Sequence, residues 1–237
     1  MKVFVAIGLC ALIIPGLAGC KASTPAKAPM APAAAQPSGS QPAIAPPAGV
    51  SAAQARTQLA ALPVKGRAAM TGYTRDQFGP AWTDNNNDPG GHNGCDTRDD
   101  ILRRDLTDVS PASGCTIQSG TLHDVYTGKT IAFQRGPKSS VVQIDHMVPL
   151  GDAWQTGAQQ LTAERRQDLA NDPLNLQAVD GPTNEAKGDG DAATWLPPNN
   201  AYRCVYVERQ IAVKTAYGLW ITSGEHDAMD KLLAGCN

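Results

Sequence analysis

The chain has 237 residues and a formal net charge of −2; 42% of its residues are apolar, 18% are charged and 5% are aromatic. This length suffices for one sizeable hydrophobic core, so we expect a single domain with appendages. Length and composition exclude a multi-domain assembly, a coiled coil and a collagen-like rod.

The first 19 residues are typical of an export signal. Lys2 supplies a positive charge, and the apolar run over residues 3–17 ends at small residues. The run is shorter than the roughly 20 apolar residues of a membrane-spanning helix. Its end, Leu17-Ala18-Gly19-Cys20, looks like a bacterial lipobox, in which the cysteine is lipidated, so we expect a lipid anchor on Cys20. The alternative is an ordinary secretory signal with a chance cysteine.

Residues 20–52 are interpreted as a tether. Residues 21–50 contain seven prolines and ten alanines but no acidic or aromatic residue. Such a segment buries too little apolar surface to offset the entropy lost on ordering. We expect it to be extended and to hold the domain, residues 53–237, away from the membrane.

The domain combines predicted helices with short predicted strands. Periodicity, capping residues and prolines predict helices over residues 53–62, 96–106, 149–154, 162–170, 182–187, 200–217 and 224–234. Strands are predicted over residues 116–126, 129–134, 141–144 and 175–179, the first two as a hairpin. Residues 72–94 are rich in Gly, Asn, Asp and Pro and should be mostly loop. This mixture indicates an α+β fold.

The charge of the domain is more negative than that of the whole chain. Residues 1–50 hold three lysines and no acidic residue, so 17 basic and 22 acidic residues follow, a net charge of −5. A generic nucleic-acid binder usually shows a basic surface, so the balance disfavours non-specific electrostatic docking. The negative net charge is compatible with an enzyme that binds phosphate through a metal ion and a few local cations.

Four cysteines fall in the domain: Cys95, Cys115, Cys204 and Cys236. In an exported domain they predict two disulfides, with three possible connectivities. We favour the sequence-local pairs, Cys95–Cys115 and Cys204–Cys236. A structural zinc site of four thiolates is the alternative, disfavoured because no C-x-x-C spacing occurs.

One set of polar residues suits metal-assisted phosphodiester hydrolysis. Asp145 and His146 follow a predicted strand, and Asn184 and Lys187 lie on a later short helix. The oxygens of Asp145 and Asn184 are hard ligands that suit one divalent cation, Mg²⁺ or alternatively Mn²⁺. His146, with an ordinary pKa near 6.5, suits a general base at neutral pH. Lys187 shares a helix face with Asn184 and is expected to approach the phosphate.

Two other patterns are interpreted as structural. Asp84, Asn86 and Asp88 alternate as in calcium loops, but Pro89 replaces the required glycine and the final glutamate is missing. The four tryptophans are expected to be core residues rather than a platform for stacking bases; they are Trp82, Trp154, Trp195 and Trp220.

The run from Asp145 to Leu150 (DHMVPL) resembles the first half of the HNH (His-Me finger, ββα-metal) nuclease motif, and Asn175 and Asn184 match its later positions. The chain is also similar to exported bacterial HNH proteins related to the C-terminal domain of the GmrSD restriction endonucleases. The likeness covers roughly residues 70–215 and is carried by the segments Tyr73-Thr74-Arg75, Gly94-Cys95-Asp96-Thr97-Arg98, Asn171-Asp172-Pro173-Leu174-Asn175-Leu176 and Trp195-Leu196-Pro197-Pro198.

The resemblance implies a ββα-metal core with additional helices and a role for each matched residue. His146 would be the general base, Asp145 and Asn184 the metal ligands, and Asn175 a bracket for the loop that presents His146. Arg98 would contact phosphate. Many family members carry a final histidine where Asn184 stands, and the asparagine favours Mg²⁺ or Mn²⁺ over softer metals.

We therefore expect a monomeric bacterial lipoprotein, exported and lipid-anchored to the cell envelope on its periplasmic face or at the cell surface. Its domain would be a metal-dependent endonuclease that cuts DNA, with RNA as another candidate substrate. Two alternatives stay open. The domain could be a degenerate nuclease fold that binds a partner or polymer without catalysis, which its negative charge motivates, or a metallohydrolase of another phosphodiester.

Overall fold

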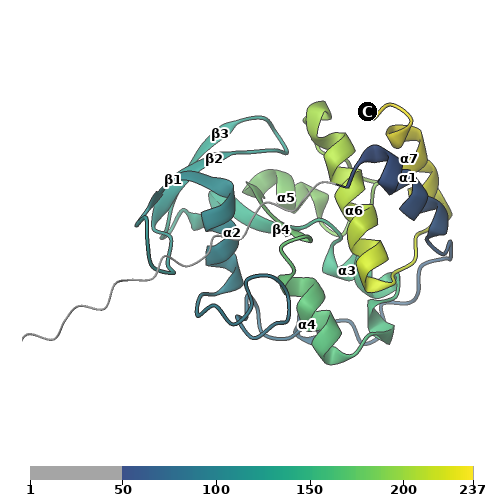
Figure 1. Cartoon of the computed structure of the whole chain (residues 1–237), viewed down its shortest axis with the longest axis horizontal. Coiled ribbons are helices and arrows are strands. Elements are labelled where there is room, and N and C mark those ends of the chain that lie inside the picture. Colours follow the sequence, from purple (N-terminus) through teal and green to yellow (C-terminus); the bar gives the residue numbers. More distant parts are fainter. Residues whose placement is uncertain (1–49, 237) are drawn as a thin grey trace, which may run out of the picture. The chain divides into compact units, whose positions relative to one another are not determined.

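The computed structural model describes residues 50–236, drawn in colour in Figure 1. The expected export signal, Cys20 and most of the expected tether lie outside the described residues, so these expectations stay predictions. Within residues 50–236, no helix combines the length and the apolar content that crossing a bilayer requires. The described part mixes helices with two small sheets, which confirms the α+β class.

The larger sheet is antiparallel and has three strands, β1 (Leu106–Ser110), β2 (Ser119–His123) and β3 (Thr130–Gln134), in that order. The pair β2–β3 is the expected hairpin, although β2 is shorter than predicted. Strand β1 was not predicted, because the helix before it was expected to continue through Leu106. That helix, α2 (Thr97–Asp105), ends one residue earlier, and Leu106 instead pairs with Leu122 across the sheet.

The smaller sheet pairs β4 (Val142–His146) with β5 (Leu176–Asp180), and α5 (Gly181–Lys187) follows directly. The strands are antiparallel and place His146 opposite Leu176. Asp180 ends β5 and caps α5 by accepting a hydrogen bond from the Thr183 amide at 3.0 Å. Gly181 permits the tight junction, because a Cβ there would lie 2.1 Å from the Ser140 carbonyl oxygen. A strand, its partner and a short helix therefore form one compact unit.

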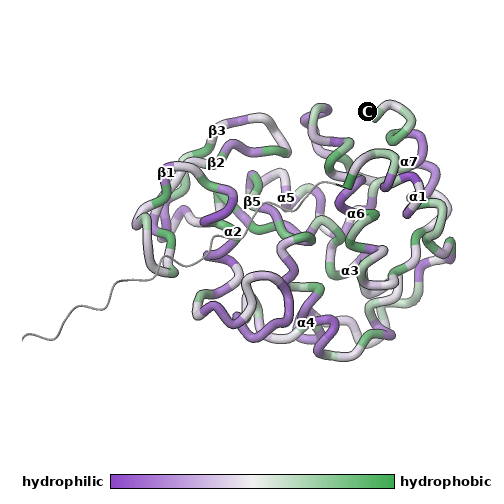
Figure 2. The backbone as a smooth tube through the Cα atoms, in the orientation of Figure 1, coloured by the Kyte–Doolittle hydropathy of each residue, from purple (hydrophilic) through white to green (hydrophobic). Residues whose placement is uncertain are grey.

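Five further helices lie to the right of and below these sheets in the view of Figure 1. They are α1 (Ala52–Ala61), α3 (Leu150–Gln155), α4 (Ala163–Asn171), α6 (Arg203–Tyr217) and α7 (Ser223–Leu233). Short 3-10 helices occur at Arg75–Phe78, Ser139–Val141, Ala158–Gln160 and Asn200–Tyr202. Helices α1, α6 and α7 pack against one another. Along the helices, hydrophobic and hydrophilic residues alternate (Figure 2), as expected for elements with one face in a core.

The hydrophobic core has three parts that meet at the end of β4. Ile144 belongs to the part between α2 and the sheets, Met147 to the part under α1, α6 and α7, and Val148 to the part around α3 and α4. Asp145 and His146 lie between these anchors in the sequence. The side chains of Ile144, Met147 and Val148 pack into three different parts of the core. The backbone that carries the two polar residues is therefore held from three directions.

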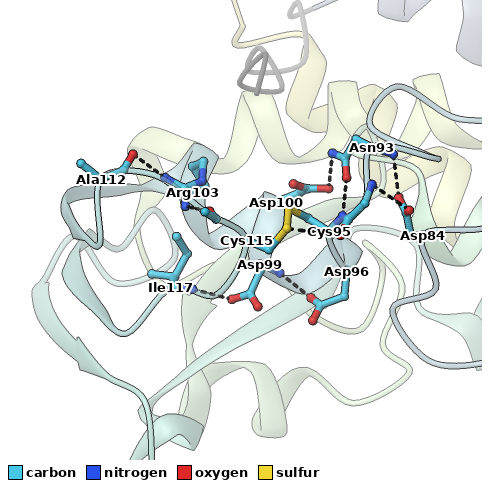
Figure 3. The surroundings of a disulfide bond; sticks show 12 residues. Asp84, Asn93, Cys95, Asp96, Asp99, Asp100, Arg103, Ala112, Cys115 and Ile117 are labelled. Carbon is cyan, nitrogen blue, oxygen red and sulfur yellow. Dashed lines mark hydrogen bonds between the residues drawn. A yellow bond between two sulfur atoms is a disulfide. The ribbon is translucent and has the colours of Figure 1, made fainter. Parts of the chain in front are cut away.

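Both favoured disulfides are present. Cys95–Cys115 links the segment before α2 to the segment between β1 and β2, and Cys204–Cys236 links the start of α6 to the end of the chain. Figure 3 shows the first bond beside the Asp96 cap of α2, whose carboxylate accepts from the Asp99 amide at 2.7 Å. Because all four cysteines of residues 50–236 are in disulfides, none of them is available as a thiolate ligand for the alternative zinc site.

Replacing both Cys204 and Cys236 with serine should lower the free energy of unfolding by about 3–4 kcal/mol, because the bond closes a loop of 32 residues in the unfolded chain. Urea denaturation without reductant measures the change. Ala234→Ser, at an exposed neighbouring position, is the control and should stay within about 0.5 kcal/mol of wild type. Equal stability of the double variant and wild type would contradict this role.

Candidate functional site

Two cavities adjoin at the end of β4. A cavity of about 210 Å³, the polar cavity, is lined by Asp145, Asn184 and Asp189 among others. A second cavity of about 240 Å³, the aromatic cavity, is lined by Phe78, Pro80 and Trp82 among others. Both cavities share three lining residues, Arg75, His146 and Leu150. The histidine expected to be the general base therefore lies where a polar and an aromatic recess meet.

Hydrogen bonding fixes the tautomer of His146. Its Nε2 lies 3.0 Å from the Ala170 carbonyl oxygen, which can only accept, so Nε2 carries the proton and Nδ1 carries the lone pair. The ring of Trp82 lies nearly parallel to the imidazole, at 11° and a centroid distance of 5.8 Å. Burial lowers the pKa of His146 to about 4. At neutral pH the imidazole is therefore uncharged and able to accept a proton at Nδ1.

Asn175 joins the two segments that orient His146. Its Oδ1 accepts from the Val148 amide at 2.9 Å, and its Nδ2 donates to the Leu169 carbonyl at 3.0 Å. Its own carbonyl accepts from the Met147 amide at 2.6 Å. One fully buried side chain thus ties the backbone after His146 to the end of α4, beside the Ala170 carbonyl that holds the imidazole. This geometry agrees with the expected bracket.

One oxygen of Asp145 is anchored and the other is free of hydrogen bonds. Lys187 Nζ lies 2.5 Å from Oδ2 and 2.6 Å from the His146 carbonyl oxygen, and the Tyr126 hydroxyl also donates to Oδ2. Burial raises the pKa of Tyr126 well above its usual value, which keeps it a neutral donor. Oδ1 has no hydrogen bond with any residue in the described part of the chain. The anchored carboxylate can therefore offer Oδ1 to a cation.

Asn184 offers an amide oxygen to the same cavity. Its Nδ2 donates to Gln143 Oε1 at 3.0 Å, and Gln143 Nε2 donates in turn to Glu185 at 2.8 Å. With its nitrogen committed, Oδ1 of Asn184 has no hydrogen bond within residues 50–236. Asp145, Asn184 and Asp189 all line the polar cavity, and their oxygens are of the hard type that Mg²⁺ or Mn²⁺ takes as ligands.

Lys187 and Arg98 were both expected to approach the phosphate, but the structure does not place either of them to do so. The side chain of Lys187 is fully buried, and its ammonium is occupied by Asp145 and backbone carbonyls, so it does not reach toward a phosphate. Arg98 is half-buried, donates to the carbonyl of Val142 at 3.3 Å and does not line either cavity. Val142 begins β4, at the opposite end of the strand from His146.

Two residues that line the cavities, Arg75 and Asp189, had no role predicted from the sequence. Trp82 was expected in the core; it packs against the core but also lines the aromatic cavity. Arg75 is exposed, lies in a 3-10 helix and is the cation that lines both cavities. It lies in one of the segments that carried the family likeness, yet no role had been assigned to it. Asp189 follows Lys187 by two residues and packs against α3, where a Cβ at Gly151 would lie 2.4 Å from its carboxylate. Trp82 is partly exposed and forms a cavity wall, whereas Trp154 and Trp220 are buried as expected.

Comparisons with known proteins confirm the part of the resemblance that concerns the GmrSD C-terminal domain. The family model described as "GmrSD restriction endonucleases, C-terminal domain" matches residues 96–232. An "Uncharacterized secreted protein" of Arthroderma benhamiae is 38% identical over 175 residues, which cover 73% of this chain and 80% of that protein. No solved structure gives a significant match. Because the family model spans more than half of the sequence, the chain belongs to the family of GmrSD restriction endonuclease C-terminal domains.

Proposed function

We propose that the domain is a metal-dependent endonuclease that hydrolyses phosphodiester bonds of DNA, with RNA as the other candidate polymer. The observation that carries this proposal is the neutral His146, which has Nδ1 free to accept a proton and lines a cavity together with hard oxygen donors. Membership in a restriction-endonuclease family supports the same chemistry. The paired strands β4 and β5 with α5 behind them resemble the strand–strand–helix unit that the HNH likeness implies, although α3 and α4 lie between the two strands in the sequence.

In the proposed reaction, His146 accepts a proton at Nδ1 from the attacking water while Nε2 stays bonded to the Ala170 carbonyl. The water oxygen forms a bond to phosphorus and the bond from phosphorus to the leaving ester oxygen breaks. Asp145 and Asn184 would hold the cation, with Asp189 as a further ligand or a partner of bound water. When bound, a divalent cation supplies charge stabilisation on the phosphate and the leaving oxygen. Arg75 would contact the non-bridging phosphate oxygens.

We further propose that the protein is exported and attached to the cell envelope. Two disulfides favour an oxidising compartment, and the fungal relative is described as secreted. The lipid anchor at Cys20 rests on the sequence pattern alone.

His146→Ala should lower cleavage at least about 100-fold, because loss of a general base costs roughly 10²–10⁴ in rate. The assay is plasmid cleavage by the purified protein with Mg²⁺ or Mn²⁺, and EDTA should abolish it. His123→Ala, at an exposed histidine on β2, is the matched control and should cut like wild type. Undiminished cleavage by His146→Ala would refute the mechanism. A folded wild type that cuts nothing but binds DNA would favour the non-catalytic alternative.

In the metal-free protein, His146 should titrate at about pH 4 rather than near 6.5, because its imidazole is buried as the neutral form. NMR titration of the ring signals, assigned with His146→Gln, measures the pKa. Since the folded pKa lies below the unfolded value, the associated stability is complete above pH 6.5 and declines as pH falls toward 4. A midpoint near 6.5 would show an exposed imidazole instead.

Arg75→Ala should lower kcat/KM by about tenfold or more, since a charged hydrogen bond to phosphate contributes about 1.5–3 kcal/mol. Arg98→Ala is the matched arginine variant. Its half-buried guanidinium bonds to β4, so it should reduce the denaturation midpoint more than it reduces cleavage. If Arg98→Ala lowered cleavage more than Arg75→Ala did, the phosphate contact would belong to Arg98 instead.

A further inference from the structure

The aromatic cavity has a size and lining that the proposed hydrolysis does not explain. Its volume of about 240 Å³ is below the roughly 300–1,000 Å³ of sites for drug-sized ligands, so it suits one flat ring system. Phe78, Pro80 and Trp82 form an apolar wall on one stretch of chain. These residues precede residue 96, where the family match begins. The recess is therefore built mainly by a segment outside the matched part of the domain.

The backbone holds Trp82 at this wall in an unfavourable conformation. Its φ of 57° lies in the left-handed region, where a bulky side chain is an outlier that costs about 1–3 kcal/mol. The Trp82 carbonyl accepts from the Thr97 amide at 3.1 Å, and the Thr97 hydroxyl donates to the Thr83 carbonyl at 3.1 Å. Helix α2 thus fixes the ring beside His146, where it stacks on the imidazole and lines the aromatic cavity.

Asn171 adds an unused hydrogen-bond acceptor to the lining. It is 2% exposed, and its Nδ2 donates to the Gln167 carbonyl at 2.8 Å. Its Oδ1 is buried and has no hydrogen-bond partner among the described residues. An amide oxygen in this state lacks about 1–3 kcal/mol that a ligand N–H group could restore. A flat ring with an amino or imino group matches the wall, and it would reach this buried acceptor after a small shift of the Asn171 side chain.

We propose that the aromatic cavity binds one unpaired nucleobase next to the scissile phosphate, so that the enzyme acts on single-stranded nucleic acid. This inference rests on the proposed nuclease function. Arg75 lines both cavities and would contact the phosphate that links the bound nucleotide to the polar cavity. A base within a duplex is stacked and paired, and it must leave the helix before it can enter such a recess. The net charge of −5 after residue 50 offers little general attraction to duplex phosphates.

The test uses the full-length protein and DNA strands with one cleavable phosphodiester, all other linkages being methylphosphonates. One strand is intact, and two others lack the base on the 5′ or the 3′ side of that bond. Removing the base on one side should lower kcat/KM about tenfold or more, since stacking on aromatic side chains contributes to binding at each base. Annealing the complement to the intact strand should slow cleavage by a similar factor.

The variant Ala81→Phe tests whether the loss of kcat/KM on base removal comes from the aromatic cavity. Ala81 is exposed and lines the recess, so a larger side chain can fill it without entering the core. The variant should cut the intact strand about tenfold more slowly, and base removal should then have little further effect, because both changes remove the same contact. Ala53→Leu, on the exposed side of α1, is the matched control and should keep the full response to base removal.

The outcomes separate this inference from the nuclease proposal. Equal cleavage by wild type of the intact and base-free strands would overturn the base site, as would faster cleavage of the duplex. If no strand is cut with Mg²⁺ or Mn²⁺, the proposed function itself fails. The wild-type comparison needs no variant, so it decides the inference even if Ala81→Phe fails to fold.

Discussion

The buried ion pair between Lys187 and Asp145 is the interaction on which the rest of the site depends. The Lys187 side chain is fully buried, and an ammonium without a partner in that position would cost several kcal/mol. Helix α5 therefore docks against β4 with the Asp145 carboxylate turned toward Nζ. The same contact engages Oδ2 of the carboxylate and leaves Oδ1 without a hydrogen bond among residues 50–236. The packing of α5 against β4 thus orients the Asp145 carboxylate toward the polar cavity.

A second constraint acts on the loop that precedes β5. Arg104, from α2, donates to the carbonyls of Pro173 and Leu176 at 2.8 and 2.7 Å. Arg209, from α6, donates to the carbonyls of Leu174 and Leu176 at 2.8 and 2.9 Å. Two cations from distant parts of the chain thereby satisfy the backbone on both sides of Asn175. The bracket that orients His146 is rigid because its own loop is held in this way.

Local signals explain what could be predicted from the sequence. The Asp96 cap, Pro182 at the start of α5 and the short alternating strands each depend on neighbouring residues, and the elements they predict are present. Strand β1 could not be predicted in the same way, because it forms only when Leu106 meets Leu122 of β2. Lys187 was placed on the correct helix, but its direction is set by the charge of Asp145. Arg75 and Trp82 became recognisable only when the fold brought residues 75–82 to His146.

Several lysine and arginine side chains are bonded to partners inside the fold, and this limits how the protein could bind a nucleic acid. Lys214 is fully buried between Asp152 and Glu225, each at 3.0 Å, and Lys187, Arg104 and Arg209 are likewise committed to internal partners. These four are among the 17 basic residues that follow residue 50, against 22 acidic ones. Long-range attraction to a phosphate backbone is correspondingly weak. Under the proposed function, recognition of a nucleic acid would come from contacts at the two cavities, where the proposed cation ligands, the exposed Arg75 and the aromatic cavity adjoin His146. Such a site would select a substrate by the local shape of one nucleotide more than by the charge of the polymer.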